Sequence, residues 1–324
     1  MKIVIAGGSG QVGSCLSRTL AAAGHEVVVL SRGGQSGAAA RRVRWDGRTL
    51  GGWASEIDGS DAVVNLAGRS VNCRYTPKNR RQIVESRTES TRVVGEAIAR
   101  ASRPPKVWLQ AGTATIYADR RDAPNDEATG IILEHETSFP ESWTFSVGVA
   151  RAWERACDEA RTPRTRRVIL RTSLVMNPDP GSVFDVLLGL VRRGLGGAAG
   201  DGGQFVSWIH HEDFVRAAEF LIRRDDIAGA VNLTSPGPVP NSEFMRELRR
   251  AWGARFGIPA PAGILAIGAV FLRTETELIL KSRRVVPGRL LASGFEFGFP
   301  EWPGAAANLC ADWRRIRSRR GESR

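Results

Sequence analysis

A tyrosine follows an apolar run in the segment KVWLQAGTATIYAD, which spans residues 106–119. This residue, Tyr117, is one of only two tyrosines in the chain, and the other is Tyr75. A phenol held at the end of a buried strand can donate a proton in an active site. It can equally seal the rim of a sheet, because its ring is apolar and only its tip is polar. The residues around Tyr117 leave both roles open.

Three glycines follow the first apolar run, KIVIAG, and open a helical pattern. In a nucleotide-binding turn, the first glycine allows the tight turn and the second lets the backbone approach a pyrophosphate. The third packs the helix against the sheet, and the N–H groups at the helix start bind the phosphates. The spacing predicts a dinucleotide site with contacts from Gly7, Ser9, Gly10, Gln11, Val12 and Gly13.

The end of the second apolar run, VVVLSRGG, indicates which dinucleotide is bound. NAD-binding folds usually carry Asp or Glu there for the ribose hydroxyls, and an arginine accommodates a 2′-phosphate. This chain has Ser31 and Arg32 and no acid. A solvated surface arginine is the alternative in so arginine-rich a sequence. Because the carboxylate is missing, we expect NADP(H) to be preferred over NAD(H).

Short apolar runs alternate with helical patterns over most of the chain. We expect strands at 2–7, 25–32, 41–46, 61–68, 106–112, 166–176 and 228–236. Helical patterns follow the first strand up to Gly24, and they recur at about 78–100, 145–160 and within 207–224. Such alternation predicts an α/β fold with a parallel sheet covered on both faces. Since crossovers are right-handed, the fold is a doubly wound, Rossmann-type sheet.

Composition changes toward the C-terminus, where prolines and amphipathic helices dominate. We therefore predict a Rossmann domain over residues 1–235 and a smaller, mainly helical domain over 236–312 that covers the substrate. The apolar run at 259–272 is too short to span a bilayer and predicts a buried helix. Residues 313–324, WRRIRSRRGESR, form a basic tail that we expect to be disordered.

Charge and cysteine usage bound the partners and the compartment. The net charge is +12, but the basic residues are spread along the chain and no known nucleic-acid motif accompanies them. The N-terminal run passes straight into glycines, which is typical of a first strand and not of a signal peptide. The scattered cysteines predict reduced thiols in the cytoplasm and neither a zinc site nor disulfides. We expect a monomer or homodimer that binds no nucleic acid, membrane or metal.

Several segments, in this order, resemble a known superfamily. They are the glycine turn, NLAG at 65–68, SRTEST at 86–91, TATIYAD at 113–119, WE at 153–154, GLGGAAGDGGQFVSWIH at 194–210, HEDFVRA at 211–217 and VVPGRLLASGFEFGFP at 285–300. Together they resemble the extended short-chain dehydrogenase/reductases. The closest likeness is to the atypical branch, the NAD-dependent epimerase/dehydratase family proteins with a C-terminal domain of unknown function. The resemblance extends to about Leu309.

This resemblance implies further cofactor contacts. Asp46 would face the adenine, and Val175 would lie near the nicotinamide. The remaining implied contacts are Leu66 and Ala67 after the fourth strand, and Gln82 and Arg87 on the long helix. From its sequence position alone, Arg87 is an ordinary helix arginine. For His210 and Asp213 we expect structural roles, as a loop anchor and a helix cap.

The superfamily's chemistry normally uses a Tyr-x-x-x-Lys pair with a nearby Ser or Thr. The lysine lowers the pKa of the phenol so that it exchanges protons near neutral pH. Here the expected positions hold Val149 and Trp153, and no lysine lies four residues after either tyrosine. The candidate catalytic residues that remain are Thr113, which stands four residues before a tyrosine, and Tyr117 itself.

These observations favour an NADP(H)-dependent oxidoreductase or epimerase-like enzyme with an atypical site and an unknown small-molecule substrate. The missing pair favours the alternative, a non-catalytic NADPH-sensing regulator. No GxSxG or HExxH motif is present, and the four histidines lack metal-ligand spacing. Because a phenol without a cationic neighbour keeps a pKa near about 10, we expect slow turnover that does not depend on a tyrosinate.

Overall fold

The computed structural model describes residues 1–33, 40–133, 140–261, 277–319 and 321. These residues form two compact units, and each unit draws on separate stretches of the chain. The first unit contains Met1–Ile116, Phe145–Thr172 and Val215–Val231. The second contains Tyr117–Thr144, Ser173–Phe214 and Asn232–Arg324.

A seven-stranded sheet organises the first unit, in the order β10-β6-β5-β4-β1-β2-β3. Its strands are β1 (Lys2–Ala6), β2 (Glu26–Ser31), β3 (Arg41–Arg44), β4 (Ala62–Asn65), β5 (Val107–Thr113), β6 (Arg166–Thr172) and β10 (Gly229–Leu233). The pairs β1–β2, β1–β4, β2–β3, β4–β5 and β5–β6 are all parallel. The order reverses at β1, which is the switch point of a doubly wound sheet, so the predicted Rossmann-like fold is confirmed.

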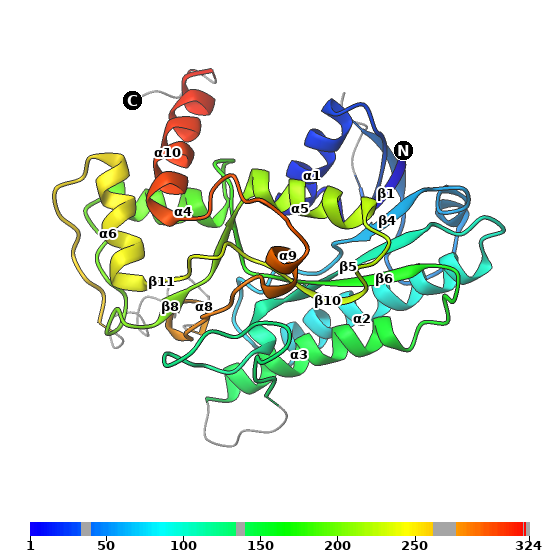
Figure 1. Cartoon of the computed structure of the whole chain (residues 1–324), viewed down its shortest axis with the longest axis horizontal. Helices are drawn as coiled ribbons and strands as arrows, with labels where there is room; N and C mark the ends of the chain where they lie inside the picture. Colours follow the sequence, from blue (N-terminus) through cyan, green and yellow to red (C-terminus); the bar gives the residue numbers. More distant parts are fainter. Residues whose placement is uncertain (34–39, 134–139, 262–276, 320, 322–324) are drawn as a thin grey trace. The chain divides into compact units, whose positions relative to one another are not determined.

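Nearly continuous apolar runs explain why β1, β2 and β4 lie at the centre of a parallel sheet. All four residues of β4 and all but the first of β1 and β2 are buried, as expected where helices cover both faces. The helices are α1 (Gln11–Ala22), α2 (Pro77–Arg100), α3 (Glu141–Asp158) and α5 (His211–Arg223). Figure 1 shows α2 and α3 side by side along one face of the sheet, with α1 and α5 along the other.

The α2–α3 face carries a large hydrophobic core. Side chains from both helices pack there with strand residues and with a tryptophan pair outside the sheet. The main members are Val4, Val28, Val63, Trp108, Val93, Val94, Ile98, Cys157, Trp45 and Trp53. Helix α2 begins sharply because Pro77 occupies its first turn and the Thr76 side chain accepts a hydrogen bond from the Asn79 N–H.

The second unit combines short strands with helices. Strand β7 (Leu174–Met176) pairs in parallel with β9 (Trp208–His210), and β8 (Phe205–Val206) pairs antiparallel with β11 (Val239–Pro240). The helices are α4 (Val183–Arg192), α6 (Asn241–Trp252), α8 (Glu277–Leu280), α9 (Gly288–Ala292) and α10 (Trp302–Arg319). Helices α4, α6 and α10 enclose its core, in which the ring of Phe244 stacks on that of Trp302 with 3.9 Å between the ring centroids. Two short 3-10 helices, η1 (Gly52–Glu56) and η2 (Ala114–Ile116), lie in the first unit.

The predicted division of the chain at 235/236 differs from these units. Residues 117–144 and 173–214 belong to the second unit although they precede residue 236. The chain leaves the sheet after β5 and β6 and returns to it, and local composition carries no sign of such excursions. The predicted buried helix at 259–272 lies, from residue 262 onward, outside the described residues.

The expected disorder of the basic tail is wrong for residues 313–319, which continue α10. Trp313 is buried, and its indole N–H donates to Asp185 at 2.7 Å. Arg317 pairs with the same carboxylate. The arginines therefore form the polar side of an amphipathic helix whose tryptophan belongs to the core. Among the described helices, none is long and apolar enough to cross a membrane.

Candidate functional site

The turn between β1 and α1 is built from glycines that serve different purposes. Gly7 has φ +77°, and a Cβ there would lie 2.8 Å from the backbone of Ala67. A Cβ on Gly13 would lie 2.6 Å from the carbonyl oxygen of Gly7. These two positions therefore require glycine for the fold itself.

Gly10 is different, because the fold does not need a glycine there. It caps α1 in an extended conformation, and a Cβ on it would meet only the carbonyl oxygen of Gly7, at an ordinary 3.5 Å. Ser9 and Gln11 beside it are exposed, and Val12 is half-buried. The first turn of α1 carries no acidic residue, and no side chain caps it. Such a helix start attracts anions, so the turn can hold a phosphate over Gly10.

A cavity of about 420 Å³ opens at the ends of β2 and β3. It is lined by Arg32, Arg44, Trp45, Asp46, Thr49, Gly51 and Trp53. The two tryptophan rings meet edge to face at 5.3 Å. Ser31 is buried, and its hydroxyl donates to the carbonyl of Gly33 at 3.0 Å. The cavity combines two guanidinium groups with two flat apolar rings, a combination suited to a phosphate beside a purine.

The carboxylate of Asp46 is engaged within its own turn. It accepts hydrogen bonds from the Thr49 hydroxyl at 2.6 Å, the Thr49 N–H at 3.0 Å and the Arg48 N–H at 2.8 Å. These bonds, that of the Thr49 hydroxyl above all, lower the pKa of Asp46 to about 2. The carboxylate oxygens of Asp46 already accept these hydrogen bonds, so its immediate role is to shape the wall of the cavity.

Arg44 was not among the residues predicted from the sequence. The sheet register pairs it with Ser31, so it stands beside the end of β2. A signal was available, since Arg44 is the last strand-like residue of the segment RRVRWD. Using it required knowing that β3 lies next to β2 with this register.

The loop after β4 brings Leu66 and Ala67 close to the glycine turn. Leu66 donates its N–H to the carbonyl of Ala6 at 2.8 Å, and Ala67 donates to the Asn65 side chain at 3.1 Å. Gly7 approaches this loop within the distance that a Cβ would obstruct. The ends of β1 and β4 thus form one continuous backbone surface.

Two predicted residues of α2 lie at the continuation of this loop. Gln82 accepts a hydrogen bond from Arg69, and Arg87 donates from Nη1 to the carbonyls of Arg69 and Ile83, each at 3.0 Å. The Arg87 guanidinium lies over the ring of Trp153 at 4.9 Å. Burial lowers the pKa of Arg87 to about 10. In the described part of the chain, no carboxylate pairs with it.

The two candidate catalytic residues belong to different units. Thr113 ends β5, is half-buried, and accepts a hydrogen bond from the Thr115 N–H at 3.2 Å. Tyr117 is 2% exposed, and its hydroxyl donates to Oδ1 of Asn232 at 2.9 Å. Asn232 in turn donates to the carbonyl of Val286 at 3.0 Å. Tyr117 therefore ties together distant segments of the second unit.

The two α3 positions that the sequence analysis assigned to the superfamily's tyrosine and lysine are apolar. Val149 and Trp153 are each 7% exposed on one face of α3. Next to them, Glu154 and Arg171 form a buried bidentate ion pair, with both bonds at 2.8 Å. This pair joins α3 to β6. Val175 lies in β7, in the second unit, and pairs with Ile209.

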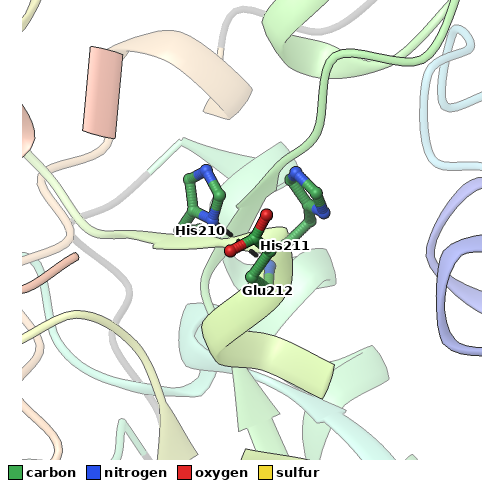
Figure 2. Close-up of side chains that lie close together, drawn as sticks. All are labelled: His210, His211 and Glu212. Atoms are coloured by element: carbon green, nitrogen blue, oxygen red, sulfur yellow. Dashed lines mark hydrogen bonds between the residues drawn. The ribbon is translucent and has the colours of Figure 1, made fainter. Parts of the chain in front are cut away.

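Figure 2 shows His210, His211 and Glu212, whose potential ligand atoms lie within 4.8 Å of one another. His210 is fully buried, its Nε2 lies 3.1 Å from the side-chain oxygen of Asn308, and its Nδ1 accepts the Glu212 N–H at 3.3 Å. Burial, followed by the charge of His211, lowers its pKa to about 3. Both nitrogens of the neutral ring are engaged, so this histidine has no lone pair left for a metal ion.

Asp213 and His210 have structural surroundings. The Asp213 carboxylate is fully buried and accepts the N–H groups of Gly298 and Phe299, each at 2.8 Å. The ring of His210 stacks on Phe299 at 3.8 Å. His210 thus anchors a loop, as predicted, whereas the printed bonds of Asp213 hold residues 298–299 and do not cap its own helix.

The chain is similar in sequence to a known family and to curated relatives in animals and bacteria. The NAD dependent epimerase/dehydratase family matches residues 3–233, and a domain of unknown function, DUF1731, matches 260–309. The human epimerase family protein SDR39U1 is 32% identical over 96% of this chain and 100% of its own length. The epimerase family protein YfhF of Bacillus subtilis is 30% identical over 98% of this chain and 100% of its own length.

Solved structures agree in fold. The crystal structure of human SDR39U1 with NADPH has a TM-score of 0.83 and 30% identity, covering 96% of this chain and 100% of that one. MoeE5 in complex with UDP-glucuronic acid and NAD has a TM-score of 0.72 at 18% identity, covering 98% and 99%. The second likeness shows the fold alone. This chain therefore belongs to the NAD dependent epimerase/dehydratase family and carries the DUF1731 domain at its C-terminal end.

Proposed function

We propose that the protein binds NADP(H) and is an epimerase-like oxidoreductase acting on a small molecule that carries a carbonyl or secondary alcohol. The observation that carries the proposal is the cavity at the ends of β2 and β3, where Arg32 and Arg44 stand beside Trp45 and Trp53. The only carboxylate in its wall is Asp46, which is already engaged by its own turn. Such a cavity suits the 2′-phosphate and adenine of NADP(H) better than the free ribose of NAD(H).

The remaining predicted contacts fit the same cofactor. The space above Gly10 can take the pyrophosphate, since among the described residues only the Gly7 carbonyl oxygen comes within 4 Å of its Cβ position. We propose these holding residues: Gly7, Ser9, Gly10, Gln11, Val12, Gly13, Ser31, Arg32, Arg44, Asp46, Leu66, Ala67, Gln82, Arg87 and Val175. The crystal structure of the human relative contains NADPH, which supports this assignment.

A bound nicotinamide supplies hydride chemistry, and the protein supplies position and proton transfer. Thr113 ends a central strand with its side chain half-buried, and we propose that it contacts the substrate. The role of proton donor is not proposed for Tyr117, because its ring is buried and its hydroxyl already donates to Asn232.

Calorimetric titration with NADPH and NADH tests the cofactor assignment. Each guanidinium contact to a phosphate contributes about 1.5–3 kcal/mol, which corresponds to roughly a tenfold to hundredfold preference. We expect Arg32→Ala and Arg44→Ala each to lose most of the NADPH preference while NADH affinity changes little. Arg250→Ala is the matched control, because Arg250 is 83% exposed on α6. Equal affinities for NADPH and NADH in the unmutated protein would overturn the assignment.

A second candidate, a non-catalytic NADPH sensor, is favoured by one observation. Val149 and Trp153, which we take to stand at the positions of the superfamily's tyrosine and lysine, are buried and make that part of α3 apolar. The two candidates differ in one measurement, the oxidation of bound NADPH in single-turnover mixtures with aldehydes and ketones. Substrate-dependent loss of NADPH absorbance supports the enzyme, whereas tight NADPH binding without any such loss supports the sensor.

A further inference from the structure

One face of α3 contacts the loop before α2 and α2 itself, and the two helices lie side by side in Figure 1. Ser146, Val149 and Trp153 share this face, because residues separated by three, four or seven positions lie on one side of a helix. Val149 and Trp153 are nearly fully buried there. The side chains that cover this face decide its chemistry.

The first of them is Tyr75, which lies two residues before the first residue of α2. Its ring is 8% exposed and packs in a cluster with Ile83 and Val149. Its hydroxyl lies 3.4 Å from the hydroxyl of Ser146, and either can be the donor. The phenol thus stands against Val149, with its polar end beside a second hydroxyl one turn away on α3.

The second is Arg87, whose guanidinium covers Trp153 at 4.9 Å. It donates to backbone carbonyls, and no carboxylate in the described residues neutralises it. A desolvated guanidinium stabilises a nearby anion strongly, because little water screens the attraction between the two charges.

The phenol and the guanidinium lie along one face of α3. Tyr75 packs in the cluster with Ile83 and Val149, and Arg87 lies over Trp153, four residues further along α3. The Tyr75 hydroxyl lies beside Ser146, which is seven residues, or roughly 10 Å along the helix axis, from Trp153. Because little water screens them, the two groups attract across this separation, and the attraction opposes the lowering of the Arg87 pKa by burial. The same attraction favours the ionised phenol.

We infer that Tyr75 is the proton-donating residue of this site and that Arg87 is the cation that assists it. The inference rests on the proposed function, since it assigns a proton donor to that reaction. Reduction of a carbonyl requires a hydride at carbon and a proton at oxygen, and the reduced nicotinamide supplies the hydride. The Tyr75 O–H bond breaks, its proton goes to the carbonyl oxygen to form an alcohol, and the phenolate regains a proton from water. In the reverse direction the phenolate accepts the alcohol proton.

Few ionisable groups surround this phenol in the described structure. Helix α2 brings Arg87 and Arg80, whose Nε donates to the Tyr75 carbonyl at 2.9 Å. The loop brings Cys73 and Arg74. From α3 the packed side chains are Phe145, Ser146 and Val149, none of which ionises. Among these described groups, the permanently charged ones, Arg74, Arg80 and Arg87, are cations, which favour ionisation of the phenol.

Because the chain has only two tyrosines, their ionisation can be followed separately. Ultraviolet difference absorbance of tyrosinate is measured against pH in the full chain and in Tyr75→Phe, Tyr117→Phe, Arg87→Gln and Arg87→Lys. We expect two steps, with the lower one lost in Tyr75→Phe and retained in Tyr117→Phe. In Arg87→Gln the lower step should move up by about one pH unit or more, and Arg87→Lys should largely restore it. A single common step, or a lower step insensitive to Arg87→Gln, would overturn the inference.

A second measurement tests whether Tyr75 faces the reacting ring. NADP⁺ and NADPH carry the same phosphates, so the difference between their affinities reports the contribution of the positive charge on the nicotinamide ring. A phenolate beside that ring should strengthen NADP⁺ binding relative to NADPH, by up to about tenfold per pH unit through the lower step. We expect this rise in the wild type and none in Tyr75→Phe. A ratio independent of pH in the wild type would remove Tyr75 from the reacting centre.

The two proposals fail separately. A wild-type protein that bound neither NADP⁺ nor NADPH would overturn the proposed function. The absorbance titration, made without cofactor, would still decide whether Tyr75 and Arg87 form a coupled pair. Normal NADPH binding with a single tyrosinate step would leave the proposed function intact and refute the pair.

Discussion

Replacing Gly10 tests whether this glycine is needed for ligand binding and not, like Gly7 and Gly13, for the fold. A Cβ at Gly10 would contact only the carbonyl of Gly7 at 3.5 Å, whereas a Cβ at Gly13 would lie 2.6 Å from two backbone atoms. Gly10 already has φ −75° and ψ 172°, a conformation that valine adopts readily. Gly10→Val should therefore fold normally, and Gly13→Val should not.

The magnitudes follow from these distances. Loss of a favourable N-cap residue costs Gly10→Val at most about 1 kcal/mol, or roughly 2–4 °C in Tm. Overpacking in Gly13→Val costs about 1–3 kcal/mol or more. If the pyrophosphate lies over Gly10, the valine displaces it and removes charge-assisted hydrogen bonds of about 1.5–3 kcal/mol each. Two such bonds correspond to at least about a hundredfold loss of NADPH affinity.

Differential scanning fluorimetry and calorimetric titration with NADPH provide the assay. Gly304→Val is the matched control, because Gly304 lies in α10 with nothing near its Cβ position. We expect normal NADPH affinity in the control and a near-wild-type Tm in Gly10→Val, with binding lost. Binding within threefold of wild type in Gly10→Val would refute the phosphate position. Equal losses of Tm in Gly10→Val and Gly13→Val would refute the steric argument.

Three further variants address other parts of the structure. Tyr117→Phe leaves a buried amide oxygen without its donor and should lower the free energy of unfolding by about 1–3 kcal/mol, with NADPH affinity unchanged; a several-hundredfold fall in turnover would contradict this. Because the pKa of His210 is about 3 in the fold, against an ordinary 6.5, the unfolded chain binds more protons between those pH values. Denaturant titrations should show the free energy of unfolding falling by up to about 1.4 kcal/mol for each pH unit below about 6.5, with a smaller slope in His210→Gln. Glu154→Gln leaves the Arg171 guanidinium buried without its anion and should cost about 3–5 kcal/mol in urea unfolding, whereas the exposed Glu159→Gln should change little.

The sheet and its helices could be predicted because their signals are local. Most strands of the sheet contain a short apolar run, the edge strand β3 (RRVR) being the exception, and the glycine turn directly follows the first run. The division into units could not be predicted in the same way. It depends on which segments meet after the chain leaves β5 and β6, and that is decided by packing between residues far apart in sequence.

The fate of Tyr117 shows how a distant residue decides a local question. Its strand-end position fits both a proton donor and a buried ring. The role of Tyr117 depends on Asn232, 115 residues away, whose side-chain oxygen accepts a hydrogen bond from the phenol. Asn232 is itself held by its N–H to Glu127 at 2.7 Å. None of these pairings leaves a periodic trace in the sequence.

Arg87 illustrates the same limit at the candidate active site. In the sequence it is one of many helix arginines, and a search for a tyrosine followed four residues later by a lysine passes over it. That search assumes one helix carries both groups. The structure brings the two groups to one face of α3 from outside that helix, since Tyr75 packs in a cluster with Val149 and Arg87 lies over Trp153. If Val149 and Trp153 occupy the positions of the helical pair, as the sequence analysis predicts, then the same face of α3 still holds a phenol and a cation, and both come from outside that helix.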